Sequence, residues 1–299
     1  MPEANRFAAV GEMTRNALIK NLSVRFEETH LPQPGDDARA LVCGLLDLDL
    51  TDLVLAGKEA VSEDDVARIL SAAERRCRHE PVHRILGWRA FYGRDFLLSP
   101  ETLEPRPDTE TLVSAVLPLS RSVIAARGRC RVIDLGTGTG AIGLTLLCEL
   151  PQAEGTGTDI SQDALATARR NAQRLGVSDR FRTICGNWFD AVEGEYDLVV
   201  SNPPYIRHGV IATLDEDVRG FDPVVALDGG VDGLDGYRSI AAGAMSHLAP
   251  GGHIAVETGY DQQDAVCGIF QDHHFRCLER ITDFGGNDRV LIFSRKPQA

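Results

Sequence analysis

The chain has 299 residues, of which 43% are hydrophobic, and it carries a formal net charge of −13 at pH 7. This length and apolar content suffice for one large or two unequal domains with a buried core, whereas no stretch approaches the roughly 18–20 apolar residues of a membrane span. The acidic balance argues modestly against a large nucleic-acid footprint, because neutralising phosphates requires a basic surface.

The N-terminus and the cysteines predict a soluble, cytoplasmic protein. Residues 1–6 lack the basic-then-apolar pattern of an export signal. The seven cysteines are scattered, odd in number and never form a C-x-x-C pair, which argues against a disulfide framework and against a zinc site. We therefore expect no metal, no membrane contact and no direct nucleic-acid partner.

Residues 1–87 predict a small all-helical domain. Helices are expected over residues 14–29, 36–46 and 62–79. The first helix places Leu18, Leu22 and Phe26 on one face, and Ser62 begins a sequence that resembles a capping box. A helical bundle by itself indicates no chemistry.

Residues 88–105 predict a hairpin linker, because the sequence becomes aromatic and alternating around Gly93. The loop Pro105-Arg106-Pro107-Asp108-Thr109-Glu110 follows. Asp108 or Thr109 is expected to cap the next helix, which contains Leu112 and Val116.

Residues 106–299 predict an α/β domain, because strand and helix patterns alternate along them. This order implies a mostly parallel sheet with right-handed crossovers. Parallel strands are expected at residues 131–135, 154–158, 182–185, 198–201 and 253–257. Crossover helices are expected at residues 140–150, 161–175, 237–248 and 262–273. The last two strands, at 276–281 and 289–294, are predicted to be antiparallel.

The first parallel strand ends in Asp134 and leads into the glycine-rich loop 136–140. Glycines there allow a sharp turn and a ligand lying against bare backbone. Gly138-x-Gly140-x-x-Gly143 matches the dinucleotide fingerprint, and Asp159 ends the next strand, where a ribose-binding carboxylate belongs. These residues predict an adenosine-type cofactor and leave open whether it is a dinucleotide or S-adenosylmethionine.

Asn202-Pro203-Pro204-Tyr205 directly follows the apolar strand 198–201. Two prolines cannot extend a strand, so the chain must leave the sheet in a fixed bend at the edge where α/β folds place ligands. The bend presents an amide, a main-chain carbonyl and an aromatic ring, and this combination suits the binding of a planar –NH2 group. Such a bend has no role in hydride transfer. An acid such as Asp134 also suits a sulfonium cation, so the methyl donor is favoured.

With these motifs the chain resembles the HemK/PrmC family, the S-adenosylmethionine-dependent methyltransferases that modify the glutamine of the Gly-Gly-Gln motif in peptide chain release factors. The run Pro105-Arg106-Pro107-Asp108-Thr109-Glu110 narrows the resemblance, since Asn-Pro-Pro-Tyr is shared with adenine and cytosine amino-methyltransferases. Further matching stretches are Glu80-Pro81-Val82, Phe221-Asp222-Pro223, Gly229-Gly230-Val231-Asp232-Gly233 and Asp283-Phe284-Gly285-Gly286-Asn287.

The resemblance implies a Rossmann-like class I methyltransferase sheet with an antiparallel C-terminal strand, preceded by a helical domain that recognises the substrate. It implies that Asp159 holds the ribose of S-adenosylmethionine, that Trp188 flanks the adenine, and that Asn202 touches both cofactor and substrate. The loop residues implied to line the cofactor are Gly136, Thr137, Gly138, Thr139 and Gly140.

The chemistry of an amide substrate explains the tetrapeptide. Asn202 Oδ1 and the Pro203 carbonyl are each expected to accept one N–H of the substrate amide, which directs its nitrogen at the methyl group. Pro204 keeps the bend rigid, and Tyr205 is expected to pack on the amide plane. Asn202, Pro203 and Tyr205 are thus the predicted catalytic residues, and no strong base or metal is required.

Several alternatives stay open at this point. A sister enzyme that methylates a glutamine of a ribosomal protein shares the tetrapeptide, and a DNA or RNA amino-methyltransferase is a rival from another substrate class. An inactive scaffold would predict damage to the loop or tetrapeptide, and both are intact. A nicotinamide dehydrogenase is the least favoured rival.

Four further residues near these motifs carry hypotheses. His208 is predicted to be a solvated loop residue in preference to a general base. Arg106 and Glu110 either form a lid or ion pair over the cofactor or join the hairpin to the sheet. Glu104 stands where the family usually has an apolar residue, which puts the packing of its loop in question.

Overall fold

The computed structural model describes residues 13–297, so residues 1–6, on which the export-signal expectation rests, lie outside it. The chain forms two compact units that divide between Leu86 and Gly87. Each unit has its own hydrophobic core.

The first unit is helical, as predicted. It contains α1 (Arg15–Glu28), α2 (Pro34–Leu46), α3 (Leu50–Ala56), α4 (Glu63–Arg76) and α5 (Val82–Leu86). Leu18, Leu22 and Phe26 of α1 are fully buried in its core, and Ser62 Oγ accepts a hydrogen bond from the Asp65 N–H at the start of α4. The sequence pattern missed α3 and α5, because seven and five residues are too few to establish a helical period.

The second unit begins with the predicted hairpin of β1 (Trp88–Phe91) and β2 (Arg94–Leu97). Phe91 and Phe96 are buried in the core of this unit. Asn171, a fully buried residue of α8 (Gln162–Arg174), accepts from the Leu97 N–H at 2.8 Å and donates to the Leu97 carbonyl at 3.1 Å. The hairpin is therefore fastened to the α/β unit through its main chain.

The sheet has seven strands in the order β5-β4-β3-β6-β7-β9-β8. Their bounds are β3 (Cys130–Leu135), β4 (Ala153–Asp159), β5 (Phe181–Cys185), β6 (Tyr196–Ser201), β7 (Leu248–Glu257), β8 (Phe275–Thr282) and β9 (Asp288–Arg295). The first five in the order are parallel, while β9 is antiparallel to both β7 and β8. This confirms the predicted mostly parallel sheet with an antiparallel C-terminal strand.

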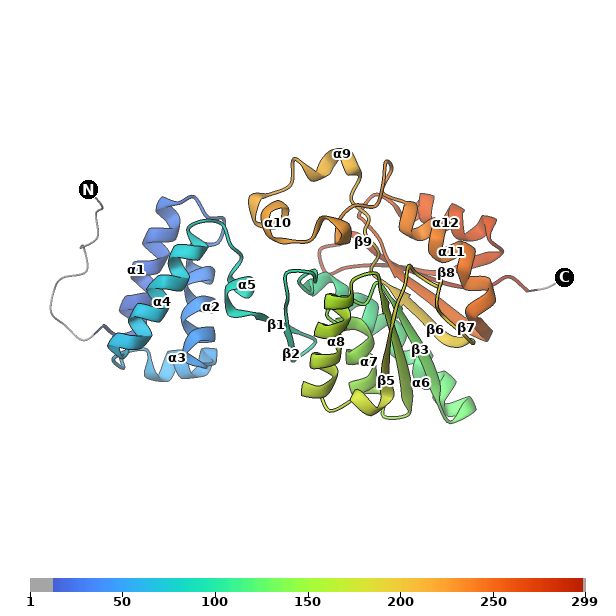
Figure 1. Cartoon of the computed structure of the whole chain (residues 1–299), viewed down its shortest axis with the longest axis horizontal. Helices are drawn as coiled ribbons and strands as arrows, with labels where there is room; N and C mark the ends of the chain where they lie inside the picture. The colour runs from blue at the N-terminus through green and yellow to red at the C-terminus, as the bar shows by residue number, and fades with distance from the viewer. Residues whose placement is uncertain (1–12, 298–299) are drawn as a thin grey trace. The chain divides into compact units, whose positions relative to one another are not determined.

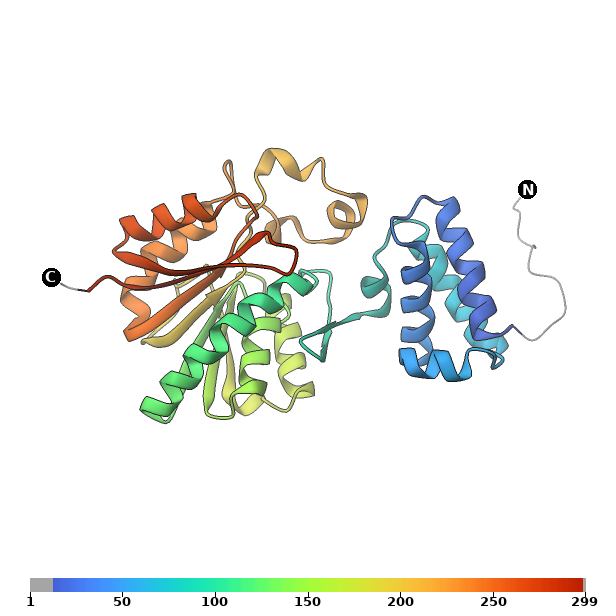
Figure 2. The ribbon, with the colours of Figure 1, turned by 180° about the vertical axis from the view of Figure 1, so that it is seen from behind.

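Helices cover both faces of this sheet (Figures 1 and 2). One face carries α8 together with α6 (Glu110–Arg127) and α7 (Ala141–Glu149), and the other carries α11 (Asp235–His247) and α12 (Gln263–Asp272). Short 3-10 turns occur at Pro107–Thr109 and Ser178–Arg180.

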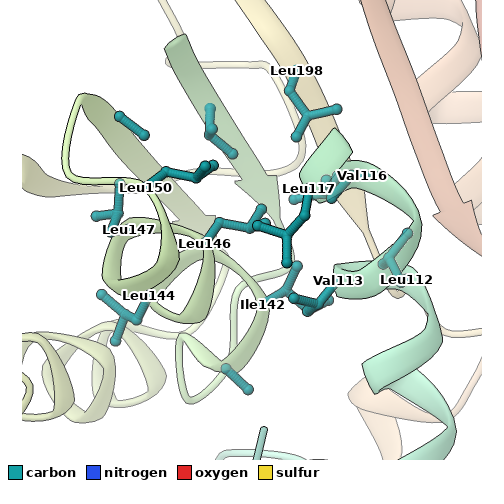
Figure 3. Packing of buried hydrophobic residues seen from close by; sticks show 14 of the residues in the cluster. Leu112, Val113, Val116, Leu117, Ile142, Leu144, Leu146, Leu147, Leu150 and Leu198 are labelled. Carbon is teal, nitrogen blue, oxygen red and sulfur yellow. The ribbon is translucent and has the colours of Figure 1, made fainter. Parts of the chain in front are cut away.

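Figure 3 shows how α6 and α7 pack on the first face through branched side chains such as Val113, Leu117 and Leu146. Burying each such side chain contributes about 1.5–3 kcal/mol, so this layer fixes the strand ends and the loops that leave them.

An insertion between β6 and α11 lies beyond the carboxyl ends of the strands (Figure 1). It contains α9 (His208–Ile211), α10 (Glu216–Phe221) and a 3-10 turn at Val224–Ala226. These elements were not predicted, since each spans at most six residues.

Among residues 13–297, no helix has the length and apolar content needed to cross a membrane.

Candidate active site

A cavity of about 330 Å³ opens at the carboxyl ends of β3, β4 and β6. Three neighbouring strands end here, so loops that are far apart in the sequence share one wall. Of the predicted site residues, those that line the cavity are Gly136, Thr137, Gly138, Thr139, Asp159, Trp188, Asn202 and Pro204. The structure thus brings the glycine loop and the start of the tetrapeptide to one place.

The loop after β3 depends on glycine at alternate positions. Gly136, Gly138 and Gly140 have φ angles of 68°, 53° and 84°, a region that other residues seldom adopt. Gly140 is the residue before α7, and a Cβ atom there would lie 2.6 Å from Leu144 Cδ1. Its role is therefore to direct the chain into α7, while Gly136 and Gly138 expose backbone to the cavity.

Asp134, at the end of β3, holds this loop through two hydrogen bonds. Its Oδ2 accepts from Thr137 Oγ1 at 2.8 Å and from the Gly143 N–H at 3.0 Å. Burial raises the pKa of the Asp134 carboxyl to about 7, although these two hydrogen bonds oppose the rise. The predicted attraction between this acid and a bound cation stays a prediction.

Asp159 presents a fixed carboxylate to the cavity. Its Oδ2 accepts from the Gly138 N–H and its Oδ1 from the Ser161 N–H, both at 2.9 Å. Burial raises its pKa, while these backbone hydrogen bonds oppose the rise. The bonds join the ends of β3 and β4, so the carboxylate and the glycine loop keep one relative position.

Trp188 also lines the cavity and lies against glycine backbone. A Cβ atom on Gly236 of α11 would lie 3.3 Å from Trp188 Cζ2 and 3.0 Å from Pro203 Cβ. The absence of a side chain at Gly236 therefore lets the indole and the proline ring lie against the helix.

The four residues of the tetrapeptide do not all face the cavity. Pro203 is buried against Gly236, and Tyr205 packs against the hydrophobic cluster between the sheet and α11, where burial raises the pKa of its hydroxyl to about 12. Asn202 and Pro204 line the cavity, whereas Pro203 and Tyr205 are not among its lining residues within 13–297. Stacking of Tyr205 on a substrate amide stays a prediction.

Main-chain hydrogen bonds hold the bend in place. The Ile206 N–H donates to the Leu227 carbonyl at 3.0 Å, and the Gly229 N–H donates to the Ile206 carbonyl at 2.9 Å. Gln262, which is buried, donates to the Tyr205 carbonyl at 3.0 Å. These bonds fasten the bend to the insertion and to Gln262.

Two buried residues not predicted to be part of the site are linked to Asn202: Thr109, which also lines the cavity, and Glu257, which does not. Asn202 Nδ2 donates to Thr109 Oγ1 at 3.2 Å, and Thr109 Oγ1 donates to Glu257 Oε2 at 2.6 Å. Thr109, one of the two predicted caps, is the N-cap residue of α6, but its side chain makes no capping hydrogen bond because its hydroxyl is directed to Glu257 instead. Burial raises the pKa of Glu257 to about 7, against the effects of Thr109 and Arg289.

The structure also shows the partners of Arg106, Glu110 and His208, whose roles the sequence left open. Arg106 Nη2 pairs with Asp222 Oδ2 of the insertion at 2.6 Å, and it lines the cavity. Glu110 instead joins the hairpin to α6, since its Oε1 accepts from the Tyr92 N–H at 2.8 Å. His208 is exposed, as predicted, and its Nδ1 lies 2.6 Å from Asp228 Oδ2.

The structure provides a charged partner for Glu104, which stands where the family usually has an apolar residue. It is buried, and its Oε2 pairs with Arg89 Nη1 of β1 at 2.6 Å. The charged residue therefore anchors the loop to the hairpin.

Across residues 13–297, no group of three or more histidine, cysteine or acidic side chains is placed to hold a metal ion.

Comparisons with known proteins agree with this geometry. The Methyltransferase small domain family matches residues 116–216, and the PrmC N-terminal domain family matches residues 17–87. A ribosomal protein L11 methylase from Lactobacillus delbrueckii subsp. bulgaricus has a similar fold, with a TM-score of 0.50 and 19% identity, covering 67% of this chain and 84% of that one. The fold and the cavity together define a class I S-adenosylmethionine-dependent methyltransferase.

Two relatives share most of the chain. A release factor glutamine methyltransferase from Agrobacterium fabrum is 50% identical over 285 residues, covering 95% of this chain and 99% of the relative. Another, from Bradyrhizobium diazoefficiens, is 46% identical over 243 residues, covering 81% of this chain and 82% of the relative. The chain belongs to the release factor glutamine methyltransferase family, which confirms the resemblance drawn from its motifs.

Proposed function

We propose that this protein transfers the methyl group of S-adenosylmethionine to the side-chain amide nitrogen, N5, of the glutamine in the Gly-Gly-Gln motif of peptide chain release factors. The observation that carries the proposal is the position of Asn202. Asn202 lines the same cavity as the glycine loop and Asp159, and its side-chain nitrogen donates to Thr109, which is also in the cavity wall.

The residues of the cavity fit the cofactor. Gly136 and Gly138 expose backbone where a side chain would intrude, Asp159 offers a fixed carboxylate that suits the two hydroxyls of a ribose, and Trp188 offers an apolar ring for a purine. When bound there, S-adenosylmethionine supplies an electrophilic methyl group on a positively charged sulfur.

The protein's contribution to the chemistry is positioning. An amide nitrogen is a weak nucleophile because its lone pair is delocalised into the carbonyl. In this proposal Asn202 Oδ1 accepts one of its N–H groups, and the carbonyl of Pro203, a residue outside the cavity lining, accepts the other. Together they orient the nitrogen and stabilise the positive charge that develops on it. Alignment of this kind can contribute about 7–11 kcal/mol in favourable systems.

Recognition of the whole protein substrate belongs, in this proposal, to residues 1–87, with residues 88–105 as a linker and residues 106–299 as the methyltransferase domain. A glutamine at a loop tip offers few atoms for discrimination, so specificity requires contacts elsewhere on the substrate. The proposal includes no nucleic-acid or membrane partner, and it implies a cytoplasmic location because release factors act on translating ribosomes.

The test is incubation of the full chain with labelled S-adenosylmethionine and purified release factor. Label is expected on the factor with an intact Gly-Gly-Gln motif and not on a Gly-Gly-Ala variant. Equal label on both factors would refute the proposal. Label on a ribosomal protein or on DNA, but not on the factor, would favour the rival substrate classes.

A further inference from the structure

The chain of hydrogen bonds behind Asn202 has a direction that can be deduced by counting protons. A threonine hydroxyl has one hydrogen to donate. Thr109 lies 2.6 Å from Glu257 Oε2 and 3.2 Å from the Asn202 amide. An ionised carboxylate only accepts, so the hydroxyl hydrogen goes to Glu257, and the hydroxyl oxygen must then accept from Asn202.

This direction determines which atom of Asn202 is presented to a ligand. Because the amide group directed at Thr109 must be the donor Nδ2, the acceptor Oδ1 occupies the other branch of the side chain. A substrate amide nitrogen carries two N–H donors and needs an acceptor. The ionised state of Glu257 is therefore the one that suits Asn202 to an –NH2 substrate.

On the basis of the proposed function, we propose that Thr109 and Glu257 are positioning residues that orient the Asn202 amide by fixing the direction of this hydrogen-bond chain. Both side chains are almost completely buried, with 4% and 1% of their surface exposed. Glu257 lies outside the cavity lining, whereas Thr109 is part of it, and the orientation of Asn202 depends on these two groups.

Protonation of Glu257 reverses the chain. A neutral carboxyl can donate to Thr109 Oγ1, whose hydrogen then turns to Asn202 and selects Oδ1 as its partner. The Asn202 –NH2 group would then face the substrate –NH2, and the two donors cannot pair. Methyl transfer should accordingly decline as the pH falls through the pKa of Glu257, which is about 7.

The groups around Glu257 set that pKa in opposing directions. Burial raises the pKa of Glu257, and Asp108 raises it further. Hydrogen bonding from Thr109 and from Asn202 itself lowers this pKa, as does Arg289 of β9, whose Nη1 lies 4.0 Å from Glu257 Oε1. The hydroxyl of Tyr237 on α11 donates to the main-chain carbonyl of Glu257 at 2.9 Å. Tyr205 also faces this carboxylate, but its own pKa of about 12 keeps it neutral in the relevant range.

The experiment compares Thr109→Val, Thr109→Ser and Glu257→Gln with the wild-type protein. Thr145→Val is the matched control, because the buried Thr145 hydroxyl has no hydrogen-bond partner among residues 13–297. For each protein, kcat and KM for release factor are measured between pH 5.5 and 8.5, and cofactor affinity is measured by calorimetry.

Thr109→Val should lower kcat about 10-fold, the equivalent of one lost hydrogen bond, with cofactor affinity within about 3-fold of wild type. Thr109→Ser should restore most of kcat, and Thr145→Val should match wild type. The glutamine in Glu257→Gln does not titrate, so whichever way its amide faces Thr109, the decline of kcat below pH 7 should disappear. A wild-type kcat for Thr109→Val, or an unchanged acid limb in Glu257→Gln, would overturn the proposal.

A measurement without turnover separates this inference from the proposed function. In protein labelled with 15N-asparagine, the Asn202 side-chain resonances should titrate with a midpoint near pH 7 in the wild type and not in Glu257→Gln. If release factor is not methylated but this titration is present, the substrate assignment fails and the hydrogen-bond chain stands. If the resonances do not titrate in the wild type, the chain itself is refuted.

Discussion

Gln262 holds the main-chain carbonyl of Tyr205, to which its Nε2 donates a hydrogen bond of 3.0 Å. The same nitrogen lies 3.3 Å from the Gly233 carbonyl, and Gln262 Oε1 accepts from the Gly259 N–H at 3.1 Å. One buried side chain thus joins the end of the tetrapeptide to the loop before α11 and to the chain after β7. Rigidity of the bend depends on this residue, which does not itself line the cavity.

Replacing Gln262 by alanine should therefore loosen the bend. The substitution leaves two buried carbonyls and one N–H without their partner, so the free energy of unfolding should fall by about 1–3 kcal/mol. Denaturant unfolding measures this loss. The kcat for release factor should fall by a larger factor than cofactor affinity, since the glycine loop is not disturbed. Gln271→Ala, at an exposed position of α12, the helix that Gln262 precedes, is the control, and equal losses in both variants would contradict the assignment.

Asp159→Ala should weaken the binding of S-adenosylmethionine. The variant removes the carboxylate that would accept the ribose hydroxyls, and it also releases the Gly138 N–H from the hydrogen bond that positions the loop. Loss of charge-assisted hydrogen bonds of about 1.5–3 kcal/mol predicts at least a 10-fold rise in Kd by calorimetry. Asp163→Ala, an exposed acid in the first turn of α8, should leave Kd unchanged. An unaltered Kd for Asp159→Ala would remove Asp159 from the cofactor site.

Gly236→Ala should impair activity and Gly268→Ala should not, although both glycines lie in helices. A Cβ atom on Gly236 would press on Pro203 and Trp188, at 3.0 and 3.3 Å, whereas one on Gly268 meets nothing within 4 Å. Gly236→Ala should therefore reduce both kcat and cofactor affinity. Gly268→Ala should raise the free energy of unfolding by about 0.5–1 kcal/mol without changing either, because alanine restricts the unfolded chain and favours the helix. Full activity in Gly236→Ala would show that the contact is not required.

The buried carboxyl of Asp134 should make stability depend on pH. Its folded pKa of about 7 lies above its ordinary value of 3.8, so between these values the folded state retains a proton that the unfolded state has released. This group's contribution to stability is thus fully present at low pH and is lost as the pH rises through about 7, with a slope of up to about 1.4 kcal/mol per pH unit. Asp134→Asn should flatten the measured dependence of unfolding free energy between pH 4 and 7, and an unchanged slope would show that Asp134 does not carry it.

The sequence by itself determined the local features of this protein. Strand and helix periods, the glycines of the loop 136–140 and the prolines after β6 act on neighbouring residues, so they could be interpreted without knowledge of the fold. They were enough to predict the mostly parallel sheet, its antiparallel end and the cavity edge at which Asp159 and Asn202 meet. The short helices α3, α5, α9 and α10 were missed because so few residues show no period.

Only the tertiary structure decided which distant side chains meet behind that edge. Thr109 and Glu257 are 148 positions apart, and Arg106 and Asp222 are 116 apart. Their local sequence suggested a helix cap for Thr109 and left the partner of Arg106 open. Such pairs form because packing of helices and strands brings buried polar groups together, where each must find a partner. Local sequence suggested that the Thr109 hydroxyl would bond to a backbone N–H at the start of a helix. In the folded protein it bonds to the buried carboxylate of Glu257 instead.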